Sequence, residues 1–168
     1  MGEPRWLNDD EQRTWRAFLS ASQLLIDQLD RELQRDADMP HAYFTILVVL
    51  SESPGRKLRM GELAELTWSS ASRLSHAVTR LEQRGWVRRA ECASDKRGHL
   101  AEITDLGMRV LEAAAEDHVT GVRAHLFDLL TDEQAARLRE ISEVILGHLG
   151  EHHPAAVRRA RSTGEPED

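Results

Sequence analysis

Hydrophobic residues recur at steps of three and four along most of this chain, which is the period of an amphipathic helix with one packed face. The first stripe follows a capping box, Asn8 with Glu11, and stops before Pro40. Its positions are Trp15, Phe18, Ser22, Ile26, Leu29 and Leu33. A last stripe follows a second capping box, Thr131 with Gln134. It consists of Leu138, Ile141, Ile145 and Leu149. The pattern therefore predicts a long helix near each end of the sequence.

The middle of the chain is divided into shorter units by turn-forming residues. Helices are predicted over residues 41–51, 60–66, 70–84 and 104–130, and a short strand over 56–59. Gly85 stands where the helix over 70–84 needs a left-handed cap. The apolar set of the helix over 104–130 is Leu106, Val110, Leu111, Ala114 and Val122. Two β-prone runs, 86–91 and 99–103, flank a mostly polar stretch ending in Gly98, which predicts a hairpin with a long loop.

The helices over 60–66 and 70–84 have the lengths and separation of a helix-turn-helix. Their predicted inward positions are Leu63, Ala64, Leu66, Leu74, Ala77, Val78 and Leu81. The second helix then presents a polar outer face: Ser69, Ser70, Ser72, Arg73, Ser75, His76, Thr79 and Arg80. Small hydroxyl groups let a helix approach the DNA major groove closely, while Arg73, Arg80 and His76 supply contacts to phosphates and base edges. An ordinary surface helix is richer in Glu and Ala, so we interpret this face as a DNA-recognition surface.

The hairpin loop carries Asp95, Lys96, Arg97 and Gly98. Taken alone, Asp and Gly mark an ordinary turn. Directly after a helix-turn-helix, two cations at a hairpin tip suit the narrow, strongly negative minor groove, so we interpret the hairpin as a DNA-binding wing. Asp95 is expected to pair with Arg97 and hold the tip in shape.

Charge is distributed unevenly along the sequence. The formal net charge of −7 over 168 residues by itself argues against a nucleic-acid partner. Residues 56–100, however, contain ten Lys and Arg against five Asp and Glu, a local charge of +5 that leaves −12 for the rest of the chain. Phosphate binding depends on local charge, so this segment is compatible with DNA, although mixed charge also simply solvates helices.

Length and composition narrow the class of protein further. The length fits one domain with a sizeable core. A single cysteine, Cys92, excludes an intramolecular disulfide framework and fits a reducing compartment. No apolar run approaches the roughly 20 residues of a membrane span, and the N-terminal sequence lacks the layout of a secretory signal, so a cytoplasmic protein is expected. No Gly-rich phosphate loop, serine elbow or carboxylate pair with an obvious pocket is present, so neither an enzyme nor a cofactor is expected.

The two outer helices carry more apolar surface than a small central block can cover. The simplest arrangement packs the two ends of the chain on each other and on a second copy, as a two-fold homodimer. A compact monomeric bundle is the alternative.

Three separated blocks carry a family resemblance. They are Met60-Gly-Glu-Leu-Ala-Glu-Leu66, Val78-Thr-Arg-Leu-Glu-Gln-Arg-Gly-Trp-Val87, and Asp95-Lys-Arg-Gly98 followed by Ile103-Thr-Asp-Leu-Gly107. Their order and spacing resemble those of MarR-type (multiple antibiotic resistance regulator) winged-helix repressors. The resemblance implies a homodimer, a palindromic double-stranded DNA operator and, often, release by a small phenolic or other lipophilic effector. The family frequently has Arg where this chain has His76, so the base contacts are not carried over.

Together, the residues and the resemblance predict a mainly α fold with a small β-wing, a winged helix-turn-helix dimerised through its N- and C-terminal helices. Residues 1–150 are expected to form a single domain. Within it, 9–38 and 105–150 are the dimerisation helices and 41–104 the winged helix-turn-helix. No periodic apolar face continues after Gly150, so we expect residues 151–168 to be a disordered tail.

The resemblance also implies an effector pocket between the dimerisation helices and the winged lobe. Its aromatic candidates are Trp15, His41, Tyr43, Phe44 and Trp68. Aromatic residues at helical spacing also form ordinary core, so both interpretations stay open for each of them. A small aromatic or lipophilic molecule is the expected ligand class.

Two other sensing chemistries are alternatives. Cys92 lies beside the wing with no preset partner and with only Arg88 and Arg89 nearby to lower its pKa, so a plain exposed thiol is the simpler interpretation and redox sensing is the alternative. The candidate metal-binding groups are Glu151, His152 and His153 with His148, or the pair His118 and His125 on one face of a helix. Neither set has the closed spacing of a metal site, so no metal is assigned.

One alternative from a different functional class remains, a protein-interaction module that reuses a winged helix without binding DNA. A gel-shift experiment separates the two. Sequence-specific retention with a steep salt dependence supports the regulator, and no retention at low salt removes it.

Overall fold

The computed structural model describes residues 4–92 and 95–150, without the side chains of residues 91, 92 and 95–98. Its elements are α1 (Asp9–Ala37), α2 (His41–Ser51), η1 (Pro54–Arg56), β1 (Lys57–Arg59), α3 (Met60–Leu66), α4 (Ala71–Gln83), β2 (Val87–Cys92), β3 (Asp95–Ile103), α5 (Asp105–His125), η2 (Phe127–Leu129) and α6 (Asp132–Leu149). The fold is mainly α with one small sheet, as predicted. The predicted tail lies outside the described residues. In the described part of the chain no helix has the length and apolar character needed to cross a membrane.

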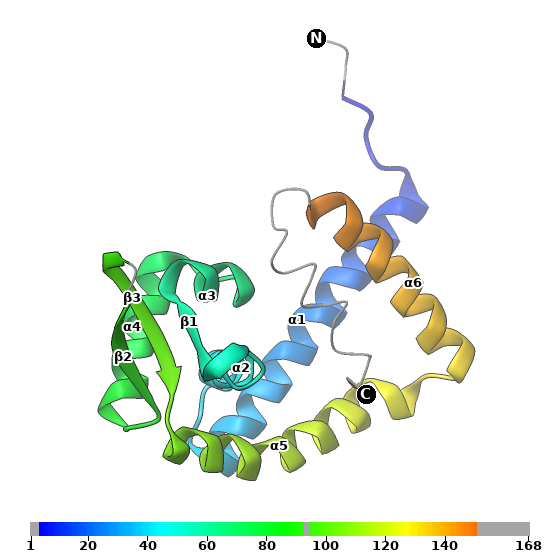
Figure 1. The fold of residues 1–168 in the computed structure, drawn as a ribbon. Coiled ribbons are helices and arrows are strands. Elements are labelled where there is room, and N and C mark those ends of the chain that lie inside the picture. The colour runs from blue at the N-terminus through cyan, green and yellow to red at the C-terminus, as the bar shows by residue number, and fades with distance from the viewer. Residues whose placement is uncertain (1–3, 93–94, 151–168) are drawn as a thin grey trace, which may run out of the picture.

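A small lobe and two projecting helical segments make up the molecule (Figure 1). α2, α3, α4 and the sheet form the lobe, and α5 leads away from it to α6. The whole of α6 and the N-terminal half of α1 project beyond the lobe. The segments predicted to read DNA and those predicted to dimerise are therefore separated in space.

The two long outer helices begin at the predicted caps. Asn8 Oδ1 accepts a hydrogen bond from Glu11 N at 2.9 Å, and Glu11 Oε2 accepts one from Asn8 N at 2.8 Å. Thr131 and Gln134 make the same reciprocal pair at the start of α6, at 3.2 and 2.9 Å. α1 ends at Asp38, whose left-handed φ of 47° turns the chain before the proline. Both capping-box predictions are confirmed.

The apolar stripes of α1 and α6 are largely uncovered. In α1 only Leu29 and Leu33 are buried, at 4% and 3% exposure. No residue of α6 is buried by the rest of the described chain. The uncovered side chains, exposed by 37–70%, include Trp15, Phe18, Leu19, Leu24 and Ile26 of α1 and Leu138, Ile141, Val144, Ile145 and Leu149 of α6. The apolar stripes of α1 and α6 are therefore left without a cover among the described residues of a single chain.

The core of the lobe is centred on α2, where Leu47 and Leu50 have no exposed surface. The inward faces of α3 and α4 are largely as predicted. Leu63, Leu74, Val78 and Leu81 are at most 1% exposed, Ala64 is 9% exposed, and Leu66 and Ala77 are partly buried. Burial of these side chains fixes which face of α4 is left for solvent.

Three antiparallel strands in the order β1-β3-β2 close one side of the lobe. The register pairs Val87 with Ile103, both buried. β3 begins at Asp95, so most of the expected long hairpin loop is strand. Glu91 pairs with His99, and the register then shifts so that Cys92 pairs with Asp95, which leaves Lys96, Arg97 and Gly98 of β3 without a register partner in β2. The predicted loop length was wrong because strand pairing uses backbone groups, which the side-chain pattern does not report.

The junction between the hairpin and α5 is tightly packed. The Thr104 hydroxyl caps α5 by accepting from Gly107 N at 3.0 Å, and it donates to the Gly85 carbonyl at 2.7 Å. A side chain at Gly107 would collide with the Trp86 carbonyl, so only glycine permits this approach. Leu106, predicted to face inward, is instead 42% exposed, because the close contact turns Gly107 toward the sheet.

Candidate nucleic-acid interface

The turn between α3 and α4 sets the direction of the second helix. Ser69 N donates to the Ala64 carbonyl at 2.9 Å and closes the end of α3. Trp68 has left-handed backbone, with φ 53°, and reverses the chain within the turn. Ser70 then caps α4, with its hydroxyl accepting from Arg73 N at 3.3 Å. This tight turn holds α4 in the orientation that a helix-turn-helix requires.

α4 presents a polar face to solvent. Ser72, Arg73, Ser75 and His76 are exposed, and their side chains have no hydrogen-bond partner within the described residues. Arg80 is exposed one turn further along. Arg73, His76 and Arg80 follow one another at steps of three and four, so they share one side of the helix. Their donors are available to a ligand outside the protein.

Four of the eight residues predicted for this face make side-chain hydrogen bonds inside the protein, among them Arg80, whose Nη1 donates to Gln83 Oε1 at 3.2 Å. Ser70 serves as the helix cap, and the Ser69 hydroxyl donates to a backbone carbonyl of the turn at 3.2 Å. The Thr79 hydroxyl donates to the Ser75 carbonyl at 2.9 Å and accepts from Arg89 at 3.1 Å. The part of the face whose side chains have no hydrogen bond within the described residues is therefore narrower than the sequence indicated. It consists of Ser72, Arg73, Ser75 and His76, and Arg80 is exposed beside them with one donor used by Gln83.

Four of the ten cations of the basic segment form ion pairs among the described residues. The ion pairs are Arg56 with Asp105 at 3.9 Å, Arg84 with Asp38 at 3.1 Å, Arg88 with Glu102 at 2.7 Å and Arg89 with Glu82 at 2.6 Å. The hydrogen bond from Arg88 holds the pKa of Glu102 below its usual value. Arg73 and Arg80 have no ion pair within the described residues. The net charge of +5 over residues 56–100 therefore overstates the positive charge that is free to bind phosphate. α4 carries two cations without an ion pair in the described part of the chain.

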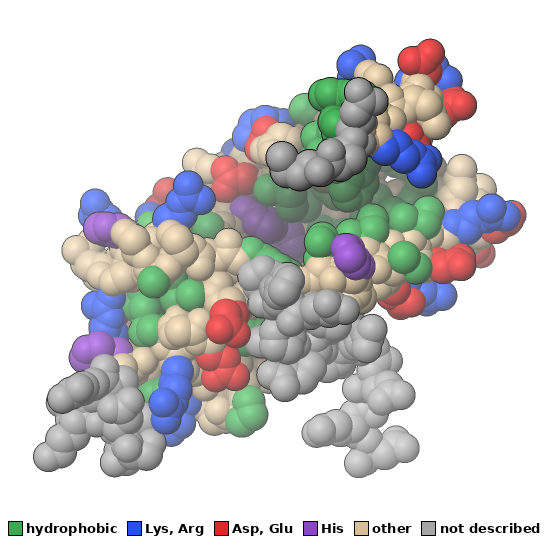
Figure 2. All heavy atoms as spheres, turned by 90° about the horizontal axis from the view of Figure 1, so that it is seen from above, with side chains coloured by type: hydrophobic (Ala, Val, Ile, Leu, Met, Phe, Trp, Pro, Cys, Tyr) green, Lys and Arg blue, Asp and Glu red, His purple; other side chains and the backbone are tan. Residues whose placement is uncertain are grey.

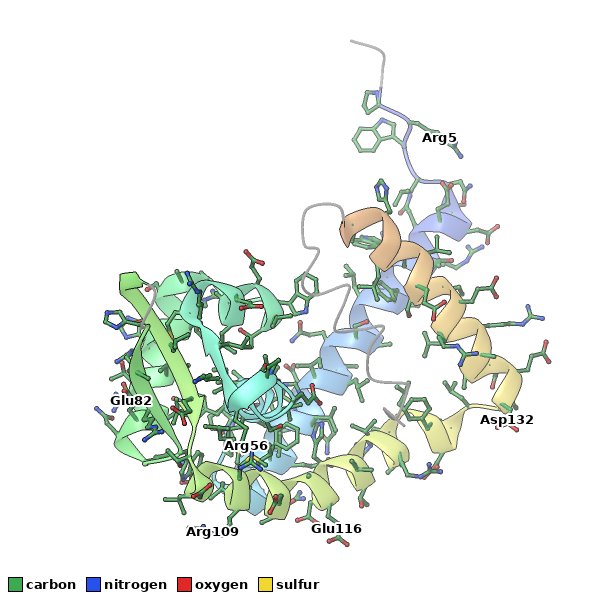
Figure 3. The ribbon with its side chains drawn as sticks, in the orientation of Figure 1. Arg5, Arg56, Glu82, Arg109, Glu116 and Asp132 are labelled. Atoms are coloured by element: carbon green, nitrogen blue, oxygen red, sulfur yellow. The ribbon has the colours of Figure 1, made fainter. Side chains whose placement is uncertain are left out.

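Sequence reasoning missed the role of Arg89. It was considered only as a neighbour of Cys92, whereas its guanidinium reaches from β2 to Glu82 on α4. Figure 3 labels Glu82 on the side of the lobe where α4 and β2 lie. One signal in the sequence points to this role. Side chains alternate between the two faces of a strand, and Val87 faces the core, so the cation two residues later also lies on the core side and needs a partner there.

The proposed wing residues, Asp95, Lys96, Arg97 and Gly98, belong to the first part of β3. Their side chains, with the expected Asp95–Arg97 pair, lie outside the described part of the structure, as does the side chain of Cys92. The wing contacts therefore stay predictions. Arg88 and Arg89, the two cations near Cys92 in the sequence, are both bound to carboxylates.

The five aromatic candidates for the effector pocket occupy different environments. Phe44 belongs to the core, at 6% exposure, and its ring lies 4.3 Å from the ring of His118. The His41 ring is 5.6 Å from the same histidine. Tyr43 is partly buried against the core, and Trp15 and Trp68 are 52% and 61% exposed. Of the five, His41 and Phe44 are thus brought together, around a histidine that the sequence had placed in a different set.

A cavity of about 540 Å³ lies between α1 and α5, a size typical of small-molecule sites. Its walls include the apolar side chains of Leu29, Leu33, Val110, Ala113, Ala114 and Ala124. Seen from above, the space-filling view shows histidine side chains in a hollow among hydrophobic ones (Figure 2). None of the five aromatic candidates lines this cavity.

The polar groups of the cavity come from both helices. Glu32 Oε1 accepts from Gln28 Nε2 at 2.7 Å and lies 2.7 Å from His125 Nε2, and these hydrogen bonds hold the pKa of Glu32 below its usual value. A side chain at Gly121 would collide with the other oxygen of the Glu32 carboxylate. His118 Nδ1 is buried without a partner in the described chain, and burial lowers the pKa of His118. The cavity thus combines an ionised carboxylate with a neutral imidazole.

Of the two candidate metal sets, one has Glu151, His152 and His153 outside the described residues, and the other, His118 with His125, lies inside them. Within the described residues, no group of three His, Cys, Asp or Glu side chains is arranged to hold a metal ion. Glu32 and His125 form a pair, and His118 packs against rings.

Two short helices joined by a tight turn, with a polar solvent-facing side on the second and an antiparallel hairpin after it, define the class of this protein. It is a winged helix-turn-helix protein.

Comparisons with known proteins give the family. A family model described as the MarR family matches residues 37–98. YpoP, an HTH-type transcriptional regulator of Bacillus subtilis, is 33% identical over 113 residues, which cover 67% of this chain and 74% of YpoP. The crystal structure of Sco3205, a MarR family transcriptional regulator from Streptomyces coelicolor in complex with DNA, is 54% identical, with a TM-score of 0.84 over 89% of this chain and 93% of that one. AbsC, a MarR family transcriptional regulator from the same organism, is 42% identical, with a TM-score of 0.81 over 87% and 98%. This chain belongs to the MarR family of transcriptional regulators.

Proposed function

We propose that this chain binds double-stranded DNA as a homodimer at a palindromic operator, and represses transcription until a small molecule releases it. The observation that carries DNA binding is the free polar side of α4, with its serine hydroxyls, Arg73, His76 and Arg80. Donors of these types bind phosphates and base edges in the major groove. The 54% identity to Sco3205, which was crystallised with DNA, supports the same use of α4 here.

A second copy of the chain is the proposed cover for the stripes of α1 and α6. Contiguous apolar surface of this extent is uncommon on a monomer and marks an interface. A two-fold pairing of these projecting helices covers both stripes and gives the dimer two copies of α4 on one side. The two helices then enter successive major grooves about 34 Å apart, which requires an operator with inverted half-sites.

Selection from a random-sequence duplex pool, followed by footprinting, tests this function. The expected result is an inverted repeat with half-site centres about 10 base pairs apart. Arg73→Ala should weaken binding, and His76→Ala should change the preferred bases. Arg123→Ala, which removes the same charge at the far end of α5, serves as the control. Recovery of no preferred duplex at low salt would refute DNA recognition and favour the protein-interaction alternative.

The cavity between α1 and α5 is the proposed effector site. The cavity lies between α1, a helix of the proposed dimer interface, and α5, the helix that begins at the hairpin. A bound molecule with different affinities for two arrangements of these helices can therefore change the spacing between the DNA-binding lobes of the dimer. Three carboxylates, Glu32, Asp36 and Asp117, line it against one guanidinium, Arg35, which already pairs with Asp36 at 2.6 Å. This balance favours a cation with an apolar body over the phenolic effector that the resemblance implied.

Three probes of matched shape and different charge test the ligand class. Tryptamine is a cation, tryptophol is neutral, and indole-3-acetate is an anion. Calorimetric titration of the full-length protein should rank tryptamine tightest and indole-3-acetate weakest. Glu32→Gln should reduce the advantage of tryptamine over tryptophol, because it removes the charge and keeps the shape. Equal binding of all three probes would contradict the proposed ligand class without affecting the DNA-binding proposal.

A further inference from the structure

Arg89 occupies a position in β2 where the strand faces the core. Val87, two residues earlier on the same side, is 2% exposed, and Ala101, the register partner of Arg89 in β3, has no exposed surface. The Arg89 side chain keeps 31% exposure, and the donors that are removed from water at such a position need partners within the protein. The partners of Arg89 all lie on α4, the helix proposed to read DNA.

Four hydrogen bonds join Arg89 to α4. They run from its backbone N to Glu82 Oε1 at 2.9 Å, from Nη1 to Glu82 Oε2 at 2.6 Å, from Nη2 to the Ser75 carbonyl at 3.2 Å, and from Nη2 to Thr79 Oγ1 at 3.1 Å. Ser75, Thr79 and Glu82 follow one another at steps of four and three, so they lie along one side of the helix. One residue of the hairpin is therefore fastened along two turns of α4.

We infer that Arg89 is a positioning residue, which fixes α4 relative to the hairpin and thereby sets operator specificity without touching DNA. The inference rests on the proposed DNA binding. A helix in the major groove and a hairpin in the neighbouring minor groove fit one operator together only when their relative position is held. A connection made before binding also removes the ordering cost that a loose hairpin would add.

Arg88 provides a matched control in the same strand. Its guanidinium binds Glu102, with Nε–Oε2 at 3.0 Å and Nη2–Oε1 at 2.7 Å. Glu102 belongs to β3, so Arg88 joins strand to strand, and within the described residues it has no hydrogen bond or ion pair with α4. Arg88→Ala and Arg89→Ala remove the same charge from adjacent positions and each break one Arg–Glu pair. The difference between the two variants isolates the connection to α4.

The test titrates the full-length protein with its selected operator duplex and with a random duplex of equal length. Arg89→Ala should weaken operator binding about tenfold, a coupling in the usual range for directly contacting residues, and change random-duplex binding by less than about threefold. Arg88→Ala should change both affinities by less than about threefold and by the same factor. Arg89→Lys keeps the charge but loses the planar fork, so it should recover part of the loss.

Glu82→Gln distinguishes positioning from simple charge attraction, because the two explanations predict opposite changes in operator affinity. Removing a negative charge strengthens a complex held only by attraction to phosphates, whereas loosening Arg89 weakens operator binding. If Arg89→Ala does not fold, as judged by its circular dichroism, Glu82→Gln and Arg89→Lys still decide the question. Equal operator losses for Arg88→Ala and Arg89→Ala, or tighter operator binding by Glu82→Gln, would overturn the inference alone. A wild-type protein that selects no duplex would overturn it together with the proposed function.

Discussion

Replacing Ile141 by alanine removes an apolar side chain from the uncovered stripe of α6, where it is 57% exposed in the single chain. A two-fold interface repeats each contact, so one substitution acts twice per dimer. Full burial of an isoleucine contributes about 1.5–3 kcal/mol, and burial of the exposed part of Ile141 about 1–1.5 kcal/mol per copy. The dimer should therefore lose about 2–3 kcal/mol, which raises its dissociation constant about 30- to 150-fold.

Sedimentation velocity over a dilution series measures that constant directly. Leu106→Ala is the control, because Leu106 is also exposed, at 42%, but lies beside Gly85 at the hairpin end of α5. The control should leave the dimer unchanged. If Ile141→Ala dissociated at the wild-type concentration, α6 would not be part of the interface. A monomeric wild-type protein would refute the proposed dimer altogether.

Three further outcomes are expected from the described geometry. Arg73→Ala should reduce the slope of log affinity against log salt by about 0.9 if Arg73 neutralises one phosphate, and an unchanged slope would remove that contact. In denaturant titrations, Gly107→Ala should lower the free energy of unfolding by about 1–3 kcal/mol, since the new Cβ meets a backbone carbonyl that cannot move away. Gly61→Ala has open space around the new Cβ and should raise the free energy of unfolding by up to about 1 kcal/mol. Burial lowers the pKa of His41 and His118, so the unfolded chain binds more protons than the folded one and stability should fall as the pH drops below 6.5. His118→Phe should flatten that decline, and an unchanged pH profile would contradict it.

The elements that the sequence predicted well are those defined by local signals. α2 and α3 span the residues expected from hydrophobic spacing, and α4 differs by one residue at each end, where Ser70 and Arg84 are its caps. Capping boxes and left-handed glycines act through hydrogen bonds and backbone angles within a few residues, so the sequence contains the whole cause. The buried side of α4 followed from the same reasoning, because period and burial are linked.

The features that the sequence did not predict depend on contacts between distant segments. The cavity combines Glu32 of α1 with His125 of α5, and its shape depends on Gly121, which gave no sign of this role. Thr79 appeared to be a DNA contact because its bond to Arg89 of β2 is not visible in the helix pattern. Arg89 itself was detectable, since a cation on the core-facing side of a strand requires a partner. Finding that partner required the fold.

The Thr104 junction makes α5 and the base of the hairpin move as one piece. The Thr104 hydroxyl and amide donate to the carbonyls of Gly85 and Trp86, and the hydroxyl also caps α5. These hydrogen bonds leave no flexible joint between strand and helix. A helix of 21 residues is about 31 Å long, so tilting α5 by about 5° displaces one end relative to the other by about 3 Å. A small displacement of α5 near Gly121 therefore becomes a larger displacement at the other end of the helix, next to the nucleic-acid side of the lobe.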